Sequence, residues 1–114
     1  MNNRKYEVVI SRSAQKEFSK LDSFIAKKIK RWIDNNLVDC ENPYFNGKQL
    51  RGNLSKYWRY RIGNYRILTE IDDLKIIIFI IKIGHRKCIY DWINSLELLI
   101  HLFIFGFVDL KVSY

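Results

Sequence analysis

One stretch of the sequence, KQLRGNLSKYWRYRIGNYRILTEIDDLKIIIFIIKIGHRKCIY (Lys48–Tyr90), decides the fold. In its YWRYRI part (Tyr57–Ile62), large apolar side chains alternate with arginines, which is the period-two pattern of a strand with one buried face. The pair Gly63-Asn64 follows, and pairs of this kind form the tight turns of β-hairpins. The stretch therefore predicts a hairpin whose second strand is Tyr65–Ile71.

A two-residue turn fixes which residues of the hairpin face each other. Ile62 then lies opposite Tyr65. Arg61 lies opposite Arg66, and Arg59 lies two residues further along the same face. Like charges directly opposite each other destabilise a sheet, by up to about 1 kcal/mol. A single arginine is most simply a solvated surface group, but three on one face, interleaved with aromatic residues, indicate a binding function.

A third strand, Leu74–Ile83, is predicted by an almost uninterrupted apolar run, which is typical of a central strand covered on both faces. If Asp72-Asp73 is also a two-residue turn, this strand ends beside the start of the second one. The residues that follow it then emerge next to the arginines of the hairpin. The candidate site is therefore a cluster at one edge of the sheet, formed by Arg61, Arg66, His85, Arg86 and Tyr90.

The N-terminal half predicts one strand and two helices. Tyr6–Ile10 is a short β-rich run, and Ser11 or Ser13 is a suitable cap for the helix that follows it. Apolar residues at helical spacing predict a second helix over about Phe24–Leu37. The segment Val38–Asn53, which contains the single proline, reads as a loop. The predicted fold is α+β, in the order β-α-α-β-β-β, with a helical hairpin on one face of an antiparallel sheet and the arginines on the open face.

Composition indicates one globular domain with an excess of positive charge. The chain has 114 residues, a formal net charge of +8 and a pI near 9.6. Between positions 48 and 90, ten lysines and arginines stand against three acidic residues. A field of this kind suits a nucleic-acid phosphate backbone, and it would also suit an acidic protein partner.

The cysteines and the apolar runs favour a cytoplasmic protein without a metal. Cys40 and Cys88 have no Cys or His neighbour at metal-ligand spacing, so we expect two ordinary thiols in a reducing compartment. The N-terminus shows no apolar run of secretory length. The apolar run Leu96–Val108 has 13 residues and contains Glu97 and His101, whereas a membrane span needs about 20. We expect no cofactor and no membrane span.

Three segments of the chain resemble the RelE/ParE superfamily of toxins from bacterial type II toxin–antitoxin modules. They are LRG (Leu50–Gly52), YWRYRIGNYRILTEI (Tyr57–Ile71) and GHRKCIY (Gly84–Tyr90), in the order and spacing of the RelE-type pattern. The resemblance covers about residues 5–90. It implies a RelE-like toxin domain at residues 1–90 and a C-terminal extension at residues 91–114.

RelE-type members are ribosome-dependent endoribonucleases that cut mRNA in the ribosomal A site. The resemblance implies a metal-free transesterification, in which the 2′-hydroxyl attacks the neighbouring phosphate. It further implies that Arg61, Arg66 and Arg86 stabilise the charge on phosphorus, and that His85 or Tyr90 transfers a proton. Some members carry lysines at the positions of Arg59 and Arg61, and because arginine is a poor base, the identity of the general base stays open. The RNA contacts expected around the cluster are Lys48, Arg51, Lys56, Arg59 and Lys87.

The resemblance also implies a partner and two alternative functions. The expected partner is an acidic, RelB-like antitoxin that masks the basic surface. One alternative is a ParE-like, non-enzymatic toxin that binds DNA gyrase, and another is an inactive remnant that only binds its antitoxin. The segment Asp91–Tyr114 is longer and more apolar than in typical members. We predict that it is helical and that it packs on the sheet, covers the active face or forms an oligomer contact, unless it is an unselected extension.

Overall fold

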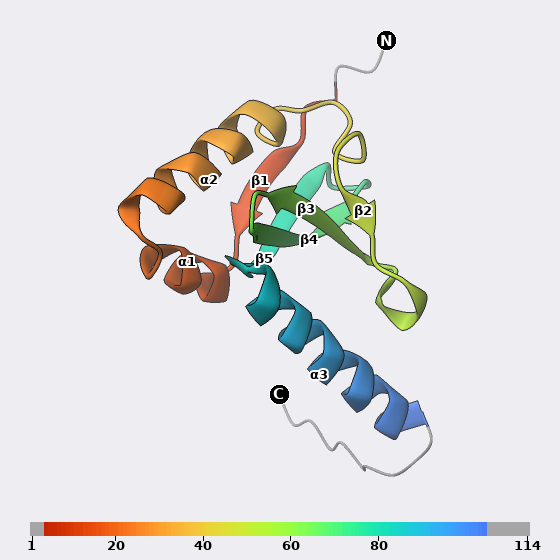
Figure 1. The fold of residues 1–114 in the computed structure, drawn as a ribbon. Coiled ribbons are helices and arrows are strands. Elements are labelled where there is room, and N and C mark those ends of the chain that lie inside the picture. Colours follow the sequence, from red (N-terminus) through yellow and green to blue (C-terminus); the bar gives the residue numbers. More distant parts are fainter. Residues whose placement is uncertain (1–3, 105–114) are drawn as a thin grey trace.

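A computed structural model describes residues 4–104 of the chain as a five-stranded sheet with helices around it (Figure 1). The strand order in the sheet is β1-β5-β4-β3-β2. The elements in chain order are β1 (Glu7–Ile10), α1 (Arg12–Ser19), α2 (Ser23–Asn36), β2 (Lys48–Gln49), the short 3-10 helix η1 (Gly52–Leu54), β3 (Tyr57–Ile62), β4 (Tyr65–Asp72), β5 (Ile77–His85) and α3 (Arg86–Ile104). The predicted α+β class and helical hairpin are confirmed.

The β3–β4 hairpin has the predicted register. Ile62 pairs with Tyr65, and Arg61 pairs with Arg66. Gly63 has a φ of +57°, whereas Asn64 lies outside the positive region. Positive φ at the first turn residue alone is the pattern of a type II′ turn, which matches the twist of a hairpin. The predicted pairing, which brings two arginines face to face, is therefore confirmed.

The connection between β4 and β5 differs from the prediction. Asp72 pairs with Ile77, so four residues form the connection, and the predicted two-residue turn with a strand starting at Leu74 is wrong. The reason lies in the Asp72 carboxylate, which accepts hydrogen bonds from the backbone N–H groups of Leu74 and Lys75, each at 3.0 Å. Aspartate often forms such local bonds, and they hold these residues in a turn rather than a strand.

Two strands extend the predicted meander. β1 pairs with β5 in parallel, from Glu7 opposite Ile77 to Ile10 opposite Ile80, so the sheet is mixed rather than purely antiparallel. β2 pairs with Arg59 and Trp58 of β3, within a segment that was predicted as a loop. A two-residue strand carries too little hydrophobic pattern to be recognised from sequence.

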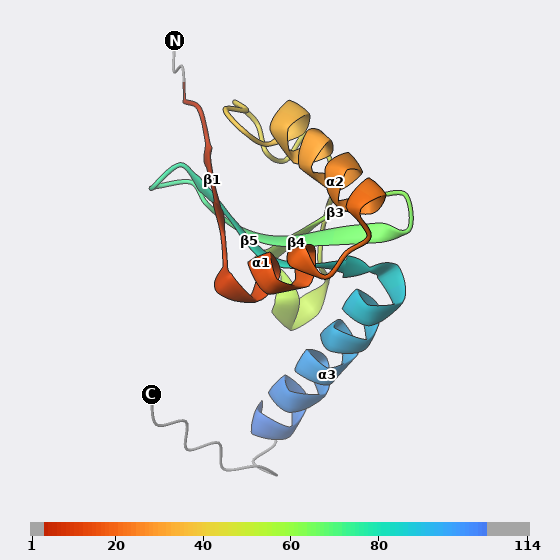
Figure 2. The ribbon, with the colours of Figure 1, turned by 90° about the vertical axis from the view of Figure 1, so that its left-hand side faces the viewer.

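The main core lies between the sheet and the first two helices. Ser11 caps α1 by accepting the N–H of Ala14, and Asp22 caps α2 by accepting the N–H of Phe24. Figure 2 shows α2 and α3 on opposite sides of the sheet. The buried members of the core cluster are Tyr6, Ala14, Ile29, Ile33, Leu37, Tyr60, Ile62, Ile67, Ile78, Ile80 and Ile83.

Helix α3 partly covers the face that was predicted to be open. It starts directly after β5 and runs without interruption through position 90 to Ile104. Leu54 of η1, Leu68 of β4 and Ile89 of α3 are all at most 2% exposed and lie outside the main core cluster. The predicted helix in the C-terminal segment is confirmed up to Ile104, and residues 105–114 lie outside the described residues. The division into residues 1–90 and 91–114 stays a prediction.

None of the helices within the described part of the chain combines the length and the apolar character that crossing a membrane requires.

Candidate active site

A cavity of about 560 Å³ lies where the β3–β4 hairpin, the end of β5 and the start of α3 meet. All five members of the predicted cluster line it, together with two of the residues expected to contact RNA. The lining residues are Arg59, Arg61, Arg66, His85, Arg86, Lys87, Ile89, Tyr90 and Ile93. We call this cavity the arginine cavity.

Strand alternation places the arginines in the arginine cavity. Arg59 and Arg61 flank Tyr60 of β3, which points into the core, so both arginines point to the opposite face. Arg66 lies directly opposite Arg61 across the hairpin and shares that face. The convergence predicted from the sequence is therefore present in the structure.

None of the described residues that line the cavity carries a carboxylate to compensate its positive charges. The pKa of Arg66 is lowered, first by burial and then by the charges of Arg61, Arg59 and Arg86. Burial and the charge of Arg61 lower the pKa of Arg59. The ion pairs recorded for the described residues, Lys30–Asp34 and Lys82–Glu17, include none of these arginines. Repulsion between the arginines adds to burial in lowering these two pKa values, and a bound anion would relieve that repulsion.

Two of the guanidinium groups have well-defined surroundings. Arg66 donates from Nη1 to the carbonyl oxygens of Gly63 at 2.8 Å and of Tyr65 at 2.9 Å, which holds it against the hairpin turn. The Nε of Arg59 is buried and has no hydrogen-bond partner within the described part of the chain. Guanidinium groups held without an acid partner are suited to binding phosphate.

The start of α3 adds positive charge to the same cavity. The N–H of Arg86 donates to the carbonyl of Asn64 at 2.7 Å, which fixes the helix start beside the hairpin turn. The first turn of α3 contains no acidic residue but carries Arg86 and Lys87. Cations at a helix N-terminus oppose the helix dipole, at a cost of about 0.3–1 kcal/mol each. The local cost to the helix is consistent with a role in holding an anion.

His85 occupies the junction between β5 and α3. Its Nδ1 accepts the backbone N–H of Lys87 at 3.2 Å, so the ring caps the first turn of the helix. The ring also meets Tyr65 edge-on, with centroids 5.7 Å apart. Since Nδ1 is engaged, Nε2 is the nitrogen left for a substrate. Tyr90, one turn further along α3, is 65% exposed.

Comparison with known proteins decides the family. Residues 8–90 match the model of a family described as the ParE toxin of the type II toxin–antitoxin system parDE. The chain belongs to the RelE/ParE toxin superfamily. Toxin RelE3 of Methanocaldococcus jannaschii is 32% identical over 92 residues, which cover 75% of this chain and 97% of that protein.

Further relatives place the chain among the RelE-type toxins of the superfamily. The mRNA interferase toxin RelE of Escherichia coli is 32% identical over 76 residues, covering 65% of this chain and 76% of that protein. A chain in the crystal structure of the toxin–antitoxin complex RelBE2 from Mycobacterium tuberculosis has a TM-score of 0.65 and 28% identity, covering 71% of this chain and 98% of that chain. The isolated E. coli RelE toxin has a TM-score of 0.59 and 26% identity, covering 70% of this chain and 83% of that chain.

The remaining residues predicted to contact RNA in this RelE-type toxin lie outside the arginine cavity. Lys48 lines a smaller cavity that shares Arg59 and Arg61 with it. Arg51 lines a separate hollow between η1 and α3. The ammonium of Lys56 lies 5.0 Å from the centre of the Tyr57 ring, beside another hollow. Their roles stay predictions.

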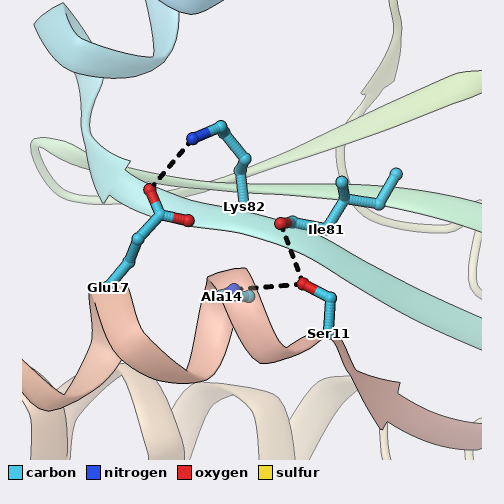
Figure 3. A network of polar contacts seen from close by, with 5 residues as sticks. All are labelled: Ser11, Ala14, Glu17, Ile81 and Lys82. Carbon is cyan, nitrogen blue, oxygen red and sulfur yellow. Dashed lines mark hydrogen bonds and ion pairs between the residues drawn. The ribbon is translucent and has the colours of Figure 1, made fainter. Parts of the chain in front are cut away.

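A polar bridge that sequence reasoning missed links α1, β5 and α3. The Lys82 ammonium lies 3.2 Å from Oε2 of Glu17 in α1 (Figure 3) and 5.5 Å from the centre of the Trp92 ring in α3. Figure 3 also shows Ser11 of the α1 cap donating to the carbonyl of Ile81, at 3.1 Å. Lys82 is the only charged residue between Ile77 and Ile83, and that interruption of an apolar run was the available signal.

No group of three or more metal-ligating side chains occurs among the residues described.

Proposed function

We propose that this RelE-type toxin is an endoribonuclease that cuts mRNA in the ribosomal A site by metal-free transesterification. The observation that carries the proposal is the convergence of arginines from β3, β4 and α3 on one cavity without a carboxylate partner among the described residues. Two relatives are named mRNA interferases, at 32% identity. An RNA phosphate is the ligand that this charge and these planar donors suit best.

In the proposed reaction, the 2′-oxygen of a ribose attacks the adjacent phosphorus, and the bond from phosphorus to the leaving 5′-oxygen breaks. The products are a 2′,3′-cyclic phosphate and a free 5′-hydroxyl. Arg61, Arg66 and Arg86 stabilise the additional negative charge on the phosphorane, which is the largest single contribution in most reactions of this kind. Because these groups stay protonated, they act as clamps and not as bases.

Two protons must move in this reaction, one from the 2′-hydroxyl and one to the leaving 5′-oxygen. We propose that His85 transfers one of them through Nε2, since its Nδ1 is engaged by the N–H of Lys87. Tyr90 is the second candidate, either as the proton donor or as a platform on which a base stacks. Arg59 and Lys87 line the same cavity and are proposed to bind flanking phosphates.

The proposed partners are the mRNA, the ribosomal A site and an acidic RelB-like antitoxin, in the cytoplasm. Solved relatives occur in complexes with RelB antitoxins, in the crystal structures of the RelBE complexes of E. coli and Mycobacterium tuberculosis. The uncompensated charge of the arginine cavity suits an acidic segment of an antitoxin as well as it suits RNA.

A second candidate function is that of a toxin that binds DNA gyrase without cleaving RNA, since the family model that the chain matches is named for ParE. The RelE-type relatives favour the nuclease over this alternative. The two functions differ in whether the arginine cavity performs chemistry.

The test is an in-vitro translation reaction with the purified protein, in which primer extension maps cuts in the mRNA. We expect cuts within codons that require translating ribosomes. Arg66→Ala should lower their rate by at least about 10²-fold, as loss of one donor to a developing oxyanion usually does. Lys75→Ala is the matched control, because Lys75 lies in the β4–β5 connection, at the other end of these strands from the cavity. Intact mRNA together with inhibited gyrase supercoiling would support the alternative.

A further inference from the structure

A second cavity of about 250 Å³ lies beside the arginine cavity. The two cavities share Arg59 and Arg61, so these guanidinium groups form a common wall. The other residues lining the second cavity are Trp32, Asn46, Gly47 and Lys48. We call it the tryptophan cavity.

The tryptophan cavity exists because β2 is short. β2 pairs only with Trp58 and Arg59, so the edge of β3 beyond Arg59 has no neighbouring strand among the described residues. The loop before β2 forms one wall of the space that remains. α2 contributes the opposite wall through Trp32, whose ring centre lies 5.3 Å from that of Tyr60.

The loop wall is held rigidly against β3. Gly47 has a φ of +84°, and a Cβ at this position would lie 2.4 Å from the carbonyl oxygen of Arg59. Only glycine permits this approach. The indole N–H of Trp58 donates to the carbonyl of Asn46 at 2.7 Å, and the hydroxyl of Tyr60 donates to the carbonyl of Pro43. The cavity is therefore formed before any ligand arrives, which lowers the entropic cost of binding.

The lining combines a flat aromatic surface with positive charge. Trp32 is half-buried and supplies the aromatic part of the lining. Lys48 is exposed and lies directly opposite Arg59 across the β2–β3 pair, so both side chains project on the same face. No acidic side chain lines the cavity among residues 4–104. An unpaired nucleotide has the matching chemistry, because its base stacks on an aromatic ring and its phosphate binds cations.

We propose that the tryptophan cavity is a subsite for the nucleotide adjacent to the cleaved phosphate. Its base stacks on Trp32, Asn46 contacts the base edge, and Lys48 and Arg59 hold its phosphate. Because the two cavities share Arg59 and Arg61, a nucleotide in the subsite would lie next to the reacting phosphate. The inference rests on the proposed function to the extent that both require a single-stranded RNA ligand.

The test measures binding without cleavage. A fluorescent tetranucleotide of 2′-O-methyl RNA, which lacks the attacking hydroxyl, is titrated with the protein, and the base is removed at one position at a time. For the wild type, we expect one position at which loss of the base weakens binding by about tenfold, the usual contribution of one stacked base. Trp32→Leu should reduce that difference to less than about twofold, whereas Trp32→Phe should keep most of it.

A second variant protects the test against a folding defect in Trp32→Leu. Lys48→Ala removes an exposed side chain, and it should weaken binding of the intact and the abasic RNA by the same factor, because it contacts phosphate. Lys75→Ala, which removes the same charge outside both cavities, should weaken binding less. Circular dichroism melting of each variant verifies that it is folded.

Two outcomes would overturn the proposal. One is an equal effect of base removal in the wild type and in Trp32→Leu at every position. The other is binding that does not depend on any base but is displaced by a hexaglutamate peptide, which would assign the cavity to an acidic protein. Absence of mRNA cleavage alongside a Trp32-dependent base effect would refute the proposed nuclease and leave the subsite intact. Cleavage of mRNA without an effect of base removal would refute the subsite and leave the proposed nuclease intact.

Discussion

The two faces of the central hairpin follow different physical rules. On the α2 side, Tyr60, Ile62 and Ile67 are at most 6% exposed and belong to one apolar core. On the α3 side, Arg61 and Arg66 lie directly opposite each other without an acidic partner among the described residues. The apolar core stabilises the folded state, whereas the repulsion between these two arginines opposes it.

The difference explains why a small domain keeps like charges in contact. Strand alternation requires that every second residue of YWRYRI point away from the core, so the site face can change without repacking the interior. Helix α3 covers part of this face through Ile89 and leaves the arginine cavity beside it. Stability and binding are therefore encoded by alternate positions of the same two strands.

The sharpest test of this separation uses two neighbouring residues. Ile67→Ala should lower the free energy of unfolding by about 2–5 kcal/mol, because it leaves a cavity in the core at a fully buried position. Arg66→Ala should stay within about 1 kcal/mol of the wild type, since it loses two bonds to turn carbonyls and also the repulsion of its neighbours.

Urea denaturation of both variants gives the two free energies. A comparable loss in Arg66→Ala would show that the arginine face contributes to the core, and the comparison would fail. A loss below about 1 kcal/mol in Ile67→Ala would show that the core face does not carry the stability assigned to it.

The second prediction separates two roles of His85. His85→Asn keeps an acceptor for the N–H of Lys87, because asparagine is a good helix cap, so the stability should change by less than about 0.5 kcal/mol. If Nε2 transfers a proton, the rate of mRNA cleavage should nevertheless fall by about 10²-fold or more. The measurement is the cleavage rate on programmed ribosomes, with the melting temperature as the control. A rate near that of the wild type would leave His85 only its capping role and would transfer the proton to Tyr90, with Tyr90→Phe as the variant to measure.

The sequence predicted where the arginines of the hairpin lie better than it predicted the strands around them. The Arg61–Arg66 pairing followed from one turn and one alternating pattern, which are local signals. The position of β1 beside β5 depends on contacts between residues about 70 positions apart, for which the sequence carries no local pattern. The prediction for the β4–β5 connection was wrong because the carboxylate of Asp72 holds a longer turn than the pair Asp72-Asp73 suggested. The tryptophan cavity was not predicted either, because it arises where a two-residue strand ends.

The smallest effect is expected from Arg61→Gln, and its sign is the informative part. The guanidinium of Arg61 lies opposite Arg66 and contributes to the lowered pKa values of both Arg59 and Arg66. Removing this charge should raise the free energy of unfolding by about 0.2–1 kcal/mol at low salt, while cleavage falls. The gain should shrink in 1 M salt, where the screening length drops to about 3 Å. Arg61→Lys keeps the charge, so its stability should stay near the wild type, and urea denaturation at two salt concentrations compares the variants. A loss of stability in Arg61→Gln would mean that the arginine face is held together by contacts stronger than its repulsion, and the division of the hairpin into a stabilising face and a binding face would not hold.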